Sequence, residues 1–294
     1  MMRVLVTGAK GQVGCSLVER LSGKVELLAI DRDELDITNE NAVFEAVKAF
    51  EPDIIINAAA HTAVDKAEEE VELSYAINRD GPLYLAQAAE SIGAALLHIS
   101  TDYVFSGDKN GIYIETDAVD PKCVYGKSKL LGEQAVLANC SRTIILRTAW
   151  VFGEDGNNFV KTILRLAQQR DELGIVADQF GGPTYAGDIA TALITIAKTI
   201  VAEDSDFDTT KYGIYHYSGL PHTSWCGFAQ TIIAKAVEQK VLNKAPIING
   251  IKTDDYPTPA KRPANSKLNT QKITETFGIQ ASDWQYALNQ LSDY

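Results

Sequence analysis

Short apolar runs alternate with longer amphipathic segments through the first half of the chain. The apolar runs are rich in Val and Ile and predict five strands, at residues 3–7, 25–30, 53–57, 94–99 and 143–147. Apolar positions at helical spacing predict helices between them: one ending at 21, 39–50, 69–91, one beginning near 125, and 157–169 with Asn157 as its cap. This order places parallel strands in one sheet with helices on both faces. We therefore predict an α/β fold, a Rossmann-type doubly wound parallel sheet.

The alternation changes beyond about residue 170. Predicted features there are a turn at 178–185, helices at 188–200, 225–241 and 283–291, an acidic solvated loop at 203–208 and a strand at 215–218. Three prolines in 256–266 disfavour a helix, because each removes a backbone donor. We divide the chain into a dinucleotide-binding domain with the catalytic residues at 1–152, and a smaller C-terminal substrate-binding lobe, mainly 153–294. Some segments of the second part can return to the Rossmann core.

The net charge and the cysteine spacing disfavour several classes of partner and of binding site. The net charge of −12 disfavours nucleic acid and anionic membranes as partners. The four cysteines are far apart and show no Cys-x-x-Cys spacing, so neither a zinc site nor a disulfide framework is expected. No apolar stretch approaches the roughly 20 residues of a spanning helix, and no charged leader precedes the first strand. We expect a cytoplasmic protein.

The first predicted strand runs into glycines at every third position, Gly8, Gly11 and Gly14. Glycines at a strand–turn–helix junction let backbone amides approach a pyrophosphate, which then lies at the positive end of the helix. The spacing differs by one residue from the usual Gly-x-Gly-x-x-Gly pattern. The alternative is a tight turn that binds nothing.

The second predicted strand ends at Asp31, 20 residues after Gly11. A carboxylate at this point can accept a hydrogen bond from an adenosine ribose, which favours NADH. Arg32 follows and can pair with a 2′-phosphate, which favours NADPH. We predict NADPH as the cofactor, with NADH also accepted; a strand-end cap is the alternative role for Asp31.

Tyr125 and Lys129 are four residues apart and share one face of a predicted helix. An ammonium beside a phenol favours the phenolate, and such a pair can act as a general acid toward a carbonyl oxygen. A single pair with this spacing also arises by chance. Thr101 and Asp102 add weight, because they follow the fourth strand, where open α/β sheets bind ligands. Structural capping is the alternative role for Thr101.

Three further segments keep two interpretations each. The small residues from Ala58 to Thr62 permit close approach of a flat ligand, or merely pack a helix against the sheet, and His61 among them can be a hydrogen-bonded loop residue. Trp150 follows the fifth strand, so it is either core or a wall for a substrate. Lys261 and Arg262 form either an anion clamp or a surface linker.

The combined motifs resemble the extended short-chain dehydrogenase/reductases, and within them the dTDP-4-dehydrorhamnose reductases. The motifs that carry this resemblance are Gly8-Ala9-Lys10-Gly11-Gln12-Val13-Gly14, Ser100-Thr101-Asp102-Tyr103-Val104-Phe105, Tyr125-Gly126-Lys127-Ser128-Lys129, the run from Asn57 to Glu68, Asn157-Asn158-Phe159, Asp178-Gln179, Pro257-Thr258-Pro259-Ala260 and Arg262-Pro263. They are spread over nearly the whole chain. The resemblance implies NAD(P)H-dependent reduction of the C4 ketone of dTDP-4-dehydro-β-L-rhamnose to dTDP-L-rhamnose, the last step in making this cell-wall sugar donor.

The resemblance also implies roles for residues. Tyr125 would protonate the carbonyl oxygen, Lys129 would lower its pKa and bind the nicotinamide ribose, and Thr101 would hold the substrate oxygen. Together with the patterns above, the resemblance gives the predicted cofactor-binding positions Gly8, Gly11, Gln12, Val13, Gly14, Asp31, Arg32, Asp36, Ile37, Ala58, Ala60, His61, Thr62, Tyr125 and Lys129. The predicted substrate-binding positions are Thr101, Asp102, Tyr125, Trp150, Asn157 and Arg262, and the resemblance implies that the C-terminal lobe holds the nucleotide.

The chain departs from the family in one respect. Some members bridge a homodimer through Mg²⁺ held by glutamates, one of them early in the first helix, where this chain has Cys15 and Ser16. We therefore assign no metal-ligating residues, and we leave open both Mg²⁺ as a cofactor and the choice between monomer and homodimer.

Three alternative functions are compatible with the same fold. A sugar dehydratase commonly has Asp-Glu after the threonine, whereas Tyr103 follows Asp102 here. An epimerase is excluded less firmly, and a non-catalytic NADP-binding regulatory subunit would not need Thr101, Tyr125 and Lys129 together.

Overall fold

A six-stranded parallel sheet organises the protein in a computed structural model that describes residues 1–203 and 208–294. Its strand order is β10-β5-β4-β3-β1-β2. The strands are β1 (Arg3–Thr7), β2 (Glu26–Ile30), β3 (Ile54–Asn57), β4 (Ala95–Thr101), β5 (Thr143–Thr148) and β10 (Gly213–His216). The order reverses direction between β1 and β3, as in doubly wound sheets. The predicted fold class is therefore confirmed.

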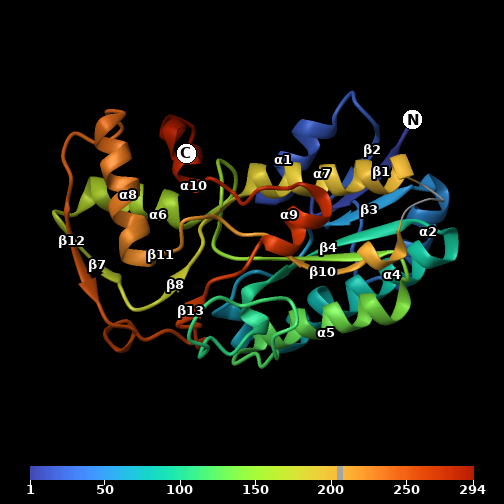
Figure 1. The fold of residues 1–294 in the computed structure, drawn as a ribbon, viewed down its shortest axis with the longest axis horizontal. Helices are drawn as coiled ribbons and strands as arrows, with labels where there is room; N and C mark the ends of the chain where they lie inside the picture. Colours follow the sequence, from blue (N-terminus) through green and yellow to red (C-terminus); the bar gives the residue numbers. More distant parts are fainter. Residues whose placement is uncertain (204–207) are drawn as a thin grey trace.

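Helices cover both faces of this sheet (Figure 1). One face carries α1 (Gln12–Leu21) and α7 (Ala186–Glu203), and the other carries α2 (Glu40–Phe50), α4 (Gly81–Ile92) and α5 (Val124–Asn139). Strand side chains alternate between the faces: Val4 and Val6 belong to the core under α1 and α7, whereas Leu5 belongs to the core under α2 and α4. Both faces are buried, which explains why the strands read as continuous apolar runs.

A smaller lobe lies beyond the carboxyl ends of the strands, at the left of Figure 1. Its regular elements are β6 (Val151–Phe152), α6 (Phe159–Gln169), β7 (Glu172–Val176), β8 (Phe180–Gly181), β9 (Thr184–Tyr185), β11 (Thr223–Ser224), α8 (Trp225–Glu238), β12 (Ile247–Ile251) and β13 (Asn265–Ser266). Its core lies between α6 and α8 around Phe152, Phe228 and Trp284. The β7–β12 ladder was not predicted; Glu172 and Ile247 are exposed on it, so its pattern is weak.

Three predicted elements need correction. The helix expected at 69–91 is divided into α3 (Val71–Tyr75), a π-helical segment (Ala76–Asp80) and α4. The cap of α6 is Asn158, whose Oδ1 accepts from the Lys161 amide at 3.1 Å, and not Asn157. The closing helix is two short pieces, α10 (Trp284–Ala287) and a 3₁₀ segment (Leu288–Asp293).

Parts of the second half return to the sheet. β10 pairs with β5 at its edge, and α7 packs beside α1. A short helix, α9 (Gln271–Phe277), lies against β10, where Phe277 meets the ring of Tyr215. Of the acidic loop expected at 203–208, residues 204–207 lie outside the described residues, while Glu203 ends α7 and Asp208 caps a 3₁₀ turn.

Other general expectations can be compared with the structure. All four cysteines are free thiols. None of the helices in the described part of the chain is long and apolar enough to cross a membrane.

Candidate functional site

The glycine turn between β1 and α1 is shaped for close backbone approach. Gly8 has φ +70°, and a Cβ there would lie 2.6 Å from the Ala59 amide nitrogen. A Cβ on Gly14 would lie 2.0 Å from the Gly8 carbonyl oxygen. Gly11 occupies the N-cap of α1, and no side chain caps that end. The first amides of α1 are therefore available to an anion, which fits a dinucleotide pyrophosphate.

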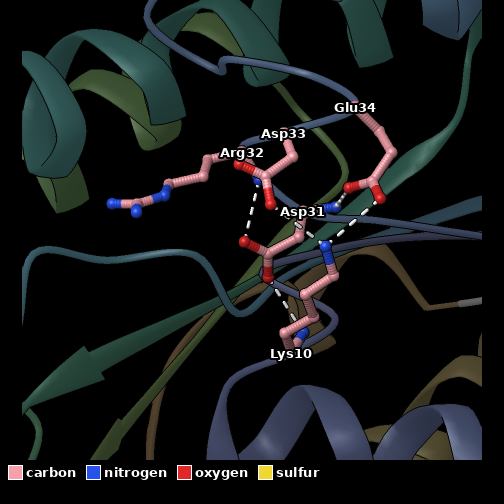
Figure 2. A network of polar contacts seen from close by, with 5 residues as sticks. All are labelled: Lys10, Asp31, Arg32, Asp33 and Glu34. Carbon is pink, nitrogen blue, oxygen red and sulfur yellow. Dashed lines mark hydrogen bonds and ion pairs between the residues drawn. The ribbon is translucent and has the colours of Figure 1, made fainter.

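Asp31 closes the turn at the end of β2 (Figure 2). Its carboxylate accepts from the backbone amide of Lys10 at 2.9 Å and from that of Arg32 at 2.8 Å. The ammonium of Lys10 contacts Asp33 at 3.2 Å and Glu34 at 3.3 Å, while the exposed guanidinium of Arg32 extends away from these groups. Asp31 thus acts as a strand-end cap, and Arg32 is a cation available at the same rim.

A cavity of about 380 Å³ opens where the strands end. Most of the predicted site residues line it: Gly11, Gln12, Val13, Ala58, Ala60, Thr62, Thr101, Asp102, Tyr125, Lys129, Trp150 and Asn157. The structure therefore brings the first amides of α1 and the Tyr125 side chain to one cavity. Four other candidates lie elsewhere: Asp31 and Arg32 at the rim, Ile37 buried against Gly81, and Asp36, which accepts from the Thr38 amide at 2.9 Å.

His61 turns its ring away from this cavity. Its Nδ1 lies 2.8 Å from the Ser74 hydroxyl and its Nε2 lies 3.0 Å from the Glu70 carboxylate. Its backbone amide donates to Asn78 at 2.8 Å, and Asn78 also donates to the Ser128 hydroxyl on α5 at 3.0 Å. The ring therefore fits the hydrogen-bonded loop residue that we had kept as an alternative, and the π-helical segment places Asn78 to hold that loop.

Tyr125 lies in the first turn of α5, with its side chain buried in the cavity. Gly126 permits this position, because a Cβ there would lie 2.3 Å from the Tyr103 carbonyl oxygen. Burial raises the pKa of the Tyr125 phenol, and a hydrogen bond with the Thr101 hydroxyl opposes that effect. The ring of Tyr103 packs edge-on against it at 5.4 Å between centroids. Tyr125 is therefore a neutral phenol at neutral pH, the form that can donate a proton.

Lys129 lies one turn further along α5 and is fully buried. Its Nζ donates to the Ile99 carbonyl at 2.7 Å and lies 3.3 Å from Nε2 of His98. Burial lowers the pKa of Lys129 to about 8, against an opposing effect of Glu133. Its Nζ is thus directed to Ile99, and burial is the largest influence on the pKa of the Tyr125 phenol, so the lowering of that pKa by Lys129 stays a prediction.

Asp102 is buried beside Thr101 and depends on a residue from the far end of the chain. Its carboxylate accepts from the Thr101 hydroxyl at 3.1 Å and from the hydroxyl of Ser266 in β13. Burial raises its pKa to about 6, and these two hydrogen bonds limit the rise. No sequence signal indicated Ser266, because only the return of β13 beside β8 brings it here.

Trp150 lies between this cavity and a second one. It has φ +49°, and its indole stacks on that of Trp225 with 3.6 Å between centroids and 9° between planes. Gly181 permits the fit, because a Cβ there would lie 2.6 Å from the Trp150 ring. The second cavity has about 600 Å³ and includes among its lining residues Phe159, Arg165, Arg170, Gln179, Trp225 and Arg262. Apart from Arg262, these were not predicted as site residues; the exposed Arg165 and Arg170, for example, carry no positional signal in the sequence.

Arg262 joins the proline-rich segment to the segments that follow β3 and β4. Its guanidinium pairs with Asp65 at 2.7 Å and donates to the Tyr103 hydroxyl at 3.3 Å. Arg262 is therefore not part of a free surface linker, whereas Lys261 is exposed. Within residues 1–203 and 208–294, no three His, Cys, Asp or Glu side chains gather as a set that could hold a metal ion.

Comparisons with known proteins extend these observations. Residues 2–294 match the family model described as the RmlD substrate binding domain. The chain is 56% identical over 296 residues to dTDP-4-dehydrorhamnose reductase of Aggregatibacter actinomycetemcomitans, covering 100% of this chain and 99% of that protein.

Two crystal structures are similar along their whole length. One is a dTDP-4-dehydrorhamnose reductase from Clostridium acetobutylicum, with TM-score 0.90, 40% identity and 99% coverage of both chains. The other is dTDP-4-dehydrorhamnose reductase from Bacillus anthracis in complex with NADP, with TM-score 0.89, 37% identity and 99% coverage of both chains. The likeness therefore includes both the glycine turn and the second lobe.

Proposed function

The chain belongs to the family of dTDP-4-dehydrorhamnose reductases, and we propose that it is an NADPH-dependent oxidoreductase of dTDP-L-rhamnose synthesis. The reaction is reduction of the C4 ketone of dTDP-4-dehydro-β-L-rhamnose. The observation that carries the proposal is a single cavity lined by the first residues of α1 and by Thr101, Tyr125 and Lys129. This places a phenolic proton donor beside a binding site for a dinucleotide.

The glycine turn at Gly8, Gly11 and Gly14 would hold the nicotinamide cofactor, which would supply the hydride. Tyr125 donates its phenol proton to the carbonyl oxygen, and its raised pKa keeps this proton in place at neutral pH. Thr101 contacts the phenol, and its hydroxyl would turn its one proton from Asp102 to the same substrate oxygen. Lys129 lies on the same face of α5 as Tyr125 and holds the nicotinamide ribose beside it.

We place the sugar against Trp150 and the nucleotide in the second cavity. Trp225 and Phe159 provide aromatic surfaces there for a thymine ring, with 4.6 Å between their ring centroids. Arg165, Arg170 and Arg262 supply cations for a diphosphate. The stacked tryptophans lie between the two cavities, so sugar and nucleotide would meet at that point. Asn157 lines the sugar side.

NADPH is the proposed cofactor, and the solved relative in complex with NADP supports it. The exposed guanidinium of Arg32 is available for a 2′-phosphate, while Asp31 is already engaged by two backbone amides. NADH, which lacks that phosphate, would bind without the Arg32 contact. The rim thus admits both cofactors and favours the phosphorylated one.

Residues 1–152 form the proposed dinucleotide-binding unit together with the returning elements α7, α9 and β10. The rest of 153–294 forms the proposed nucleotide-sugar lobe. We propose a cytoplasmic monomer or homodimer. Tyr103, which occupies the position of a dehydratase glutamate, packs edge-on against Tyr125 and accepts from Arg262, so it supplies no carboxylate for elimination of water.

The test is oxidation of NADPH, and separately of NADH, by the purified protein with dTDP-4-dehydro-L-rhamnose supplied by upstream enzymes. Tyr125→Phe is the control: it removes the proton donor and keeps the ring, so turnover should fall by about 10² or more while NADPH affinity is retained. No turnover despite tight NADPH binding would contradict the reductase and favour a binding role. Unchanged turnover in Tyr125→Phe would contradict the role of Tyr125.

A further inference from the structure

A buried polar network connects the strands of the sheet to Lys129. Asn57 at the end of β3 and His98 in β4 have no exposed surface, and Thr7 of β1 is nearly as buried. Asn57 Oδ1 accepts from the Thr7 hydroxyl at 2.8 Å and from the Ala59 amide at 3.1 Å. The Ala59 amide can only donate, so the atom that faces it is the amide oxygen of Asn57.

This orientation fixes the tautomer of His98. The Asn57 Nδ2 group, a donor, lies 3.0 Å from Nδ1 of His98, so Nδ1 accepts. Burial and the charge of Lys129 lower the pKa of His98, so its ring is neutral. A neutral ring that accepts at Nδ1 carries its proton on Nε2. Nε2 lies 3.3 Å from Nζ of Lys129.

The contact between His98 and Lys129 therefore has a direction. An uncharged amine has a lone pair that can accept from Nε2–H, and its own N–H can still donate to the Ile99 carbonyl at 2.7 Å. An ammonium has no lone pair to accept a hydrogen bond, so a protonated Lys129 would place its N–H donors against the Nε2–H donor of His98. Since the network is buried, water cannot relieve this opposition.

We propose that His98 is a positioning residue, which holds the Lys129 side chain in place and, through the tautomer set by Asn57, favours its uncharged amine. The inference rests on the proposed function, because it takes Lys129 as a residue that contacts the cofactor. The consequence is that cofactor binding and reduction depend on the protonation of Lys129 near physiological pH. Neither the sequence pattern nor the family resemblance singled out His98.

Other titratable groups face Lys129. Tyr125 and Glu133 lie on its own helix, Asp102 and Tyr103 line the same cavity, and only Glu133 acts on its charge, in favour of the ammonium. The Glu133 carboxylate is shared with Arg147 of β5 at 2.7 Å and with the Ser100 hydroxyl at 2.5 Å. The Glu133 carboxylate is therefore less available to Lys129. As a result, the proton affinity of Lys129 depends strongly on its contact with His98.

The test compares NADPH affinity at pH 6.5–10, measured by nucleotide fluorescence without any sugar, in the wild type and two variants. His98→Gln replaces Nε2–H by an amide whose oxygen can accept from the ammonium. Asn57→Asp keeps the shape of the network but accepts from Nδ1–H of His98, which turns Nε2 into an acceptor. His216→Gln is the matched control, a buried histidine of β10 that packs against Phe105.

In the wild type, affinity should fall as pH rises through the pKa of Lys129, about 8. Both variants should move this inflection upward by about one unit, as expected when a donor–donor contact becomes a hydrogen bond, whereas His216→Gln should not. An unmoved inflection in both variants overturns the inference, and so does a uniform loss of affinity at every pH, which packing alone would cause.

The same variants are then assayed for sugar reduction across this pH range. A parallel upward shift in the basic limb of kcat/KM supports the inference, and an unmoved limb overturns it. If the protein binds NADPH with the pH shifts described but never reduces the sugar, the proposed reaction is contradicted and the role of His98 is not. Failure of the proposed function can therefore be distinguished from failure of this inference.

Discussion

The indole of Trp150 stacks on the indole of Trp225, with 3.6 Å between the ring centroids. Trp150 follows β5 of the main sheet and Trp225 begins α8 of the smaller lobe, so this contact joins the two parts of the protein beside the site. Replacing Trp225 by Ala should lower the free energy of unfolding by about 2 kcal/mol, since a half-buried ring and its stacking are lost.

The same substitution should raise KM for the sugar nucleotide more than Kd for NADPH, because Trp225 lines the second cavity and not the cavity that contains Tyr125. Steady-state kinetics and NADPH titration measure the two effects. Tyr286→Ala, at a ring that is 75% exposed, is the control and should change neither. An equal loss of NADPH affinity would place the Trp225 ring in the cofactor site instead.

Thr101→Val should reduce kcat by about 10², because it removes the hydroxyl that bonds the Tyr125 phenol. Thr148 provides a matched control: it is paired with Thr101 in the β4–β5 register, and its hydroxyl has no hydrogen-bond partner among the described residues. Thr148→Val should therefore retain turnover. Comparable losses in both variants would mean that the hydroxyl of Thr101 has no special role.

Arg32→Ala should raise Kd for NADPH by about tenfold or more and leave Kd for NADH unchanged, since only NADPH offers a phosphate to the guanidinium. Fluorescence titration with each nucleotide measures this. Lys24, an exposed cation just before the other end of β2, is the control. A similar loss for NADH would assign Arg32 to a part of the cofactor that both nucleotides share.

Glu133→Ala should destabilise the protein by about 3–5 kcal/mol, because it leaves the buried guanidinium of Arg147 without its partner. The two side chains form a bidentate pair at 2.9 and 2.7 Å, and each is at most 3% exposed. Asp171→Ala removes an exposed partner of Lys244 and should leave the free energy of unfolding nearly unchanged. Chemical denaturation of the two variants gives the comparison.

Ionisation of Asp102 should lower the free energy of unfolding as pH rises from about 4 to 6. Its pKa is raised to about 6 in the folded protein, so the unfolded chain loses this proton first and gains stability relative to the native state. The full effect is about 3 kcal/mol above pH 6, and none of it is present below pH 4. Denaturation at pH 4–7 should show this slope in the wild type and a flatter one in Asp102→Asn. An equal slope in both proteins would assign the effect to other carboxyl groups.

Local patterns predicted the sheet better than the lobe. Val4, Leu5 and Val6 are buried on opposite faces of the sheet and form an apolar run that reads as a strand whatever follows it. The β7–β12 strands are half-exposed and pair across more than 70 residues, so no local period marks them. The cap of α6 was misplaced by one residue because Asn157 and Asn158 are adjacent and equally suitable from sequence.

The site residues likewise fall into those that short-range sequence features identify and those that only the folded structure brings together. Gly8, Gly11 and Tyr125 were identifiable from sequence, because a glycine turn and an i, i+4 pair on one helix are short-range features. Ser266 was not, because its hydroxyl reaches Asp102 across 164 residues of chain.

The sequence by itself determined the strands of the main sheet, the glycine turn and the helix face that carries Tyr125 and Lys129, because each depends on neighbours within a few residues. Only the tertiary structure decided the charge environment of those groups. It directs Lys129 to Ile99 and His98, buries the Tyr125 phenol and places Ser266 on Asp102. Proton affinities depend on desolvation and on partners from distant strands, and these exist only once the chain has folded.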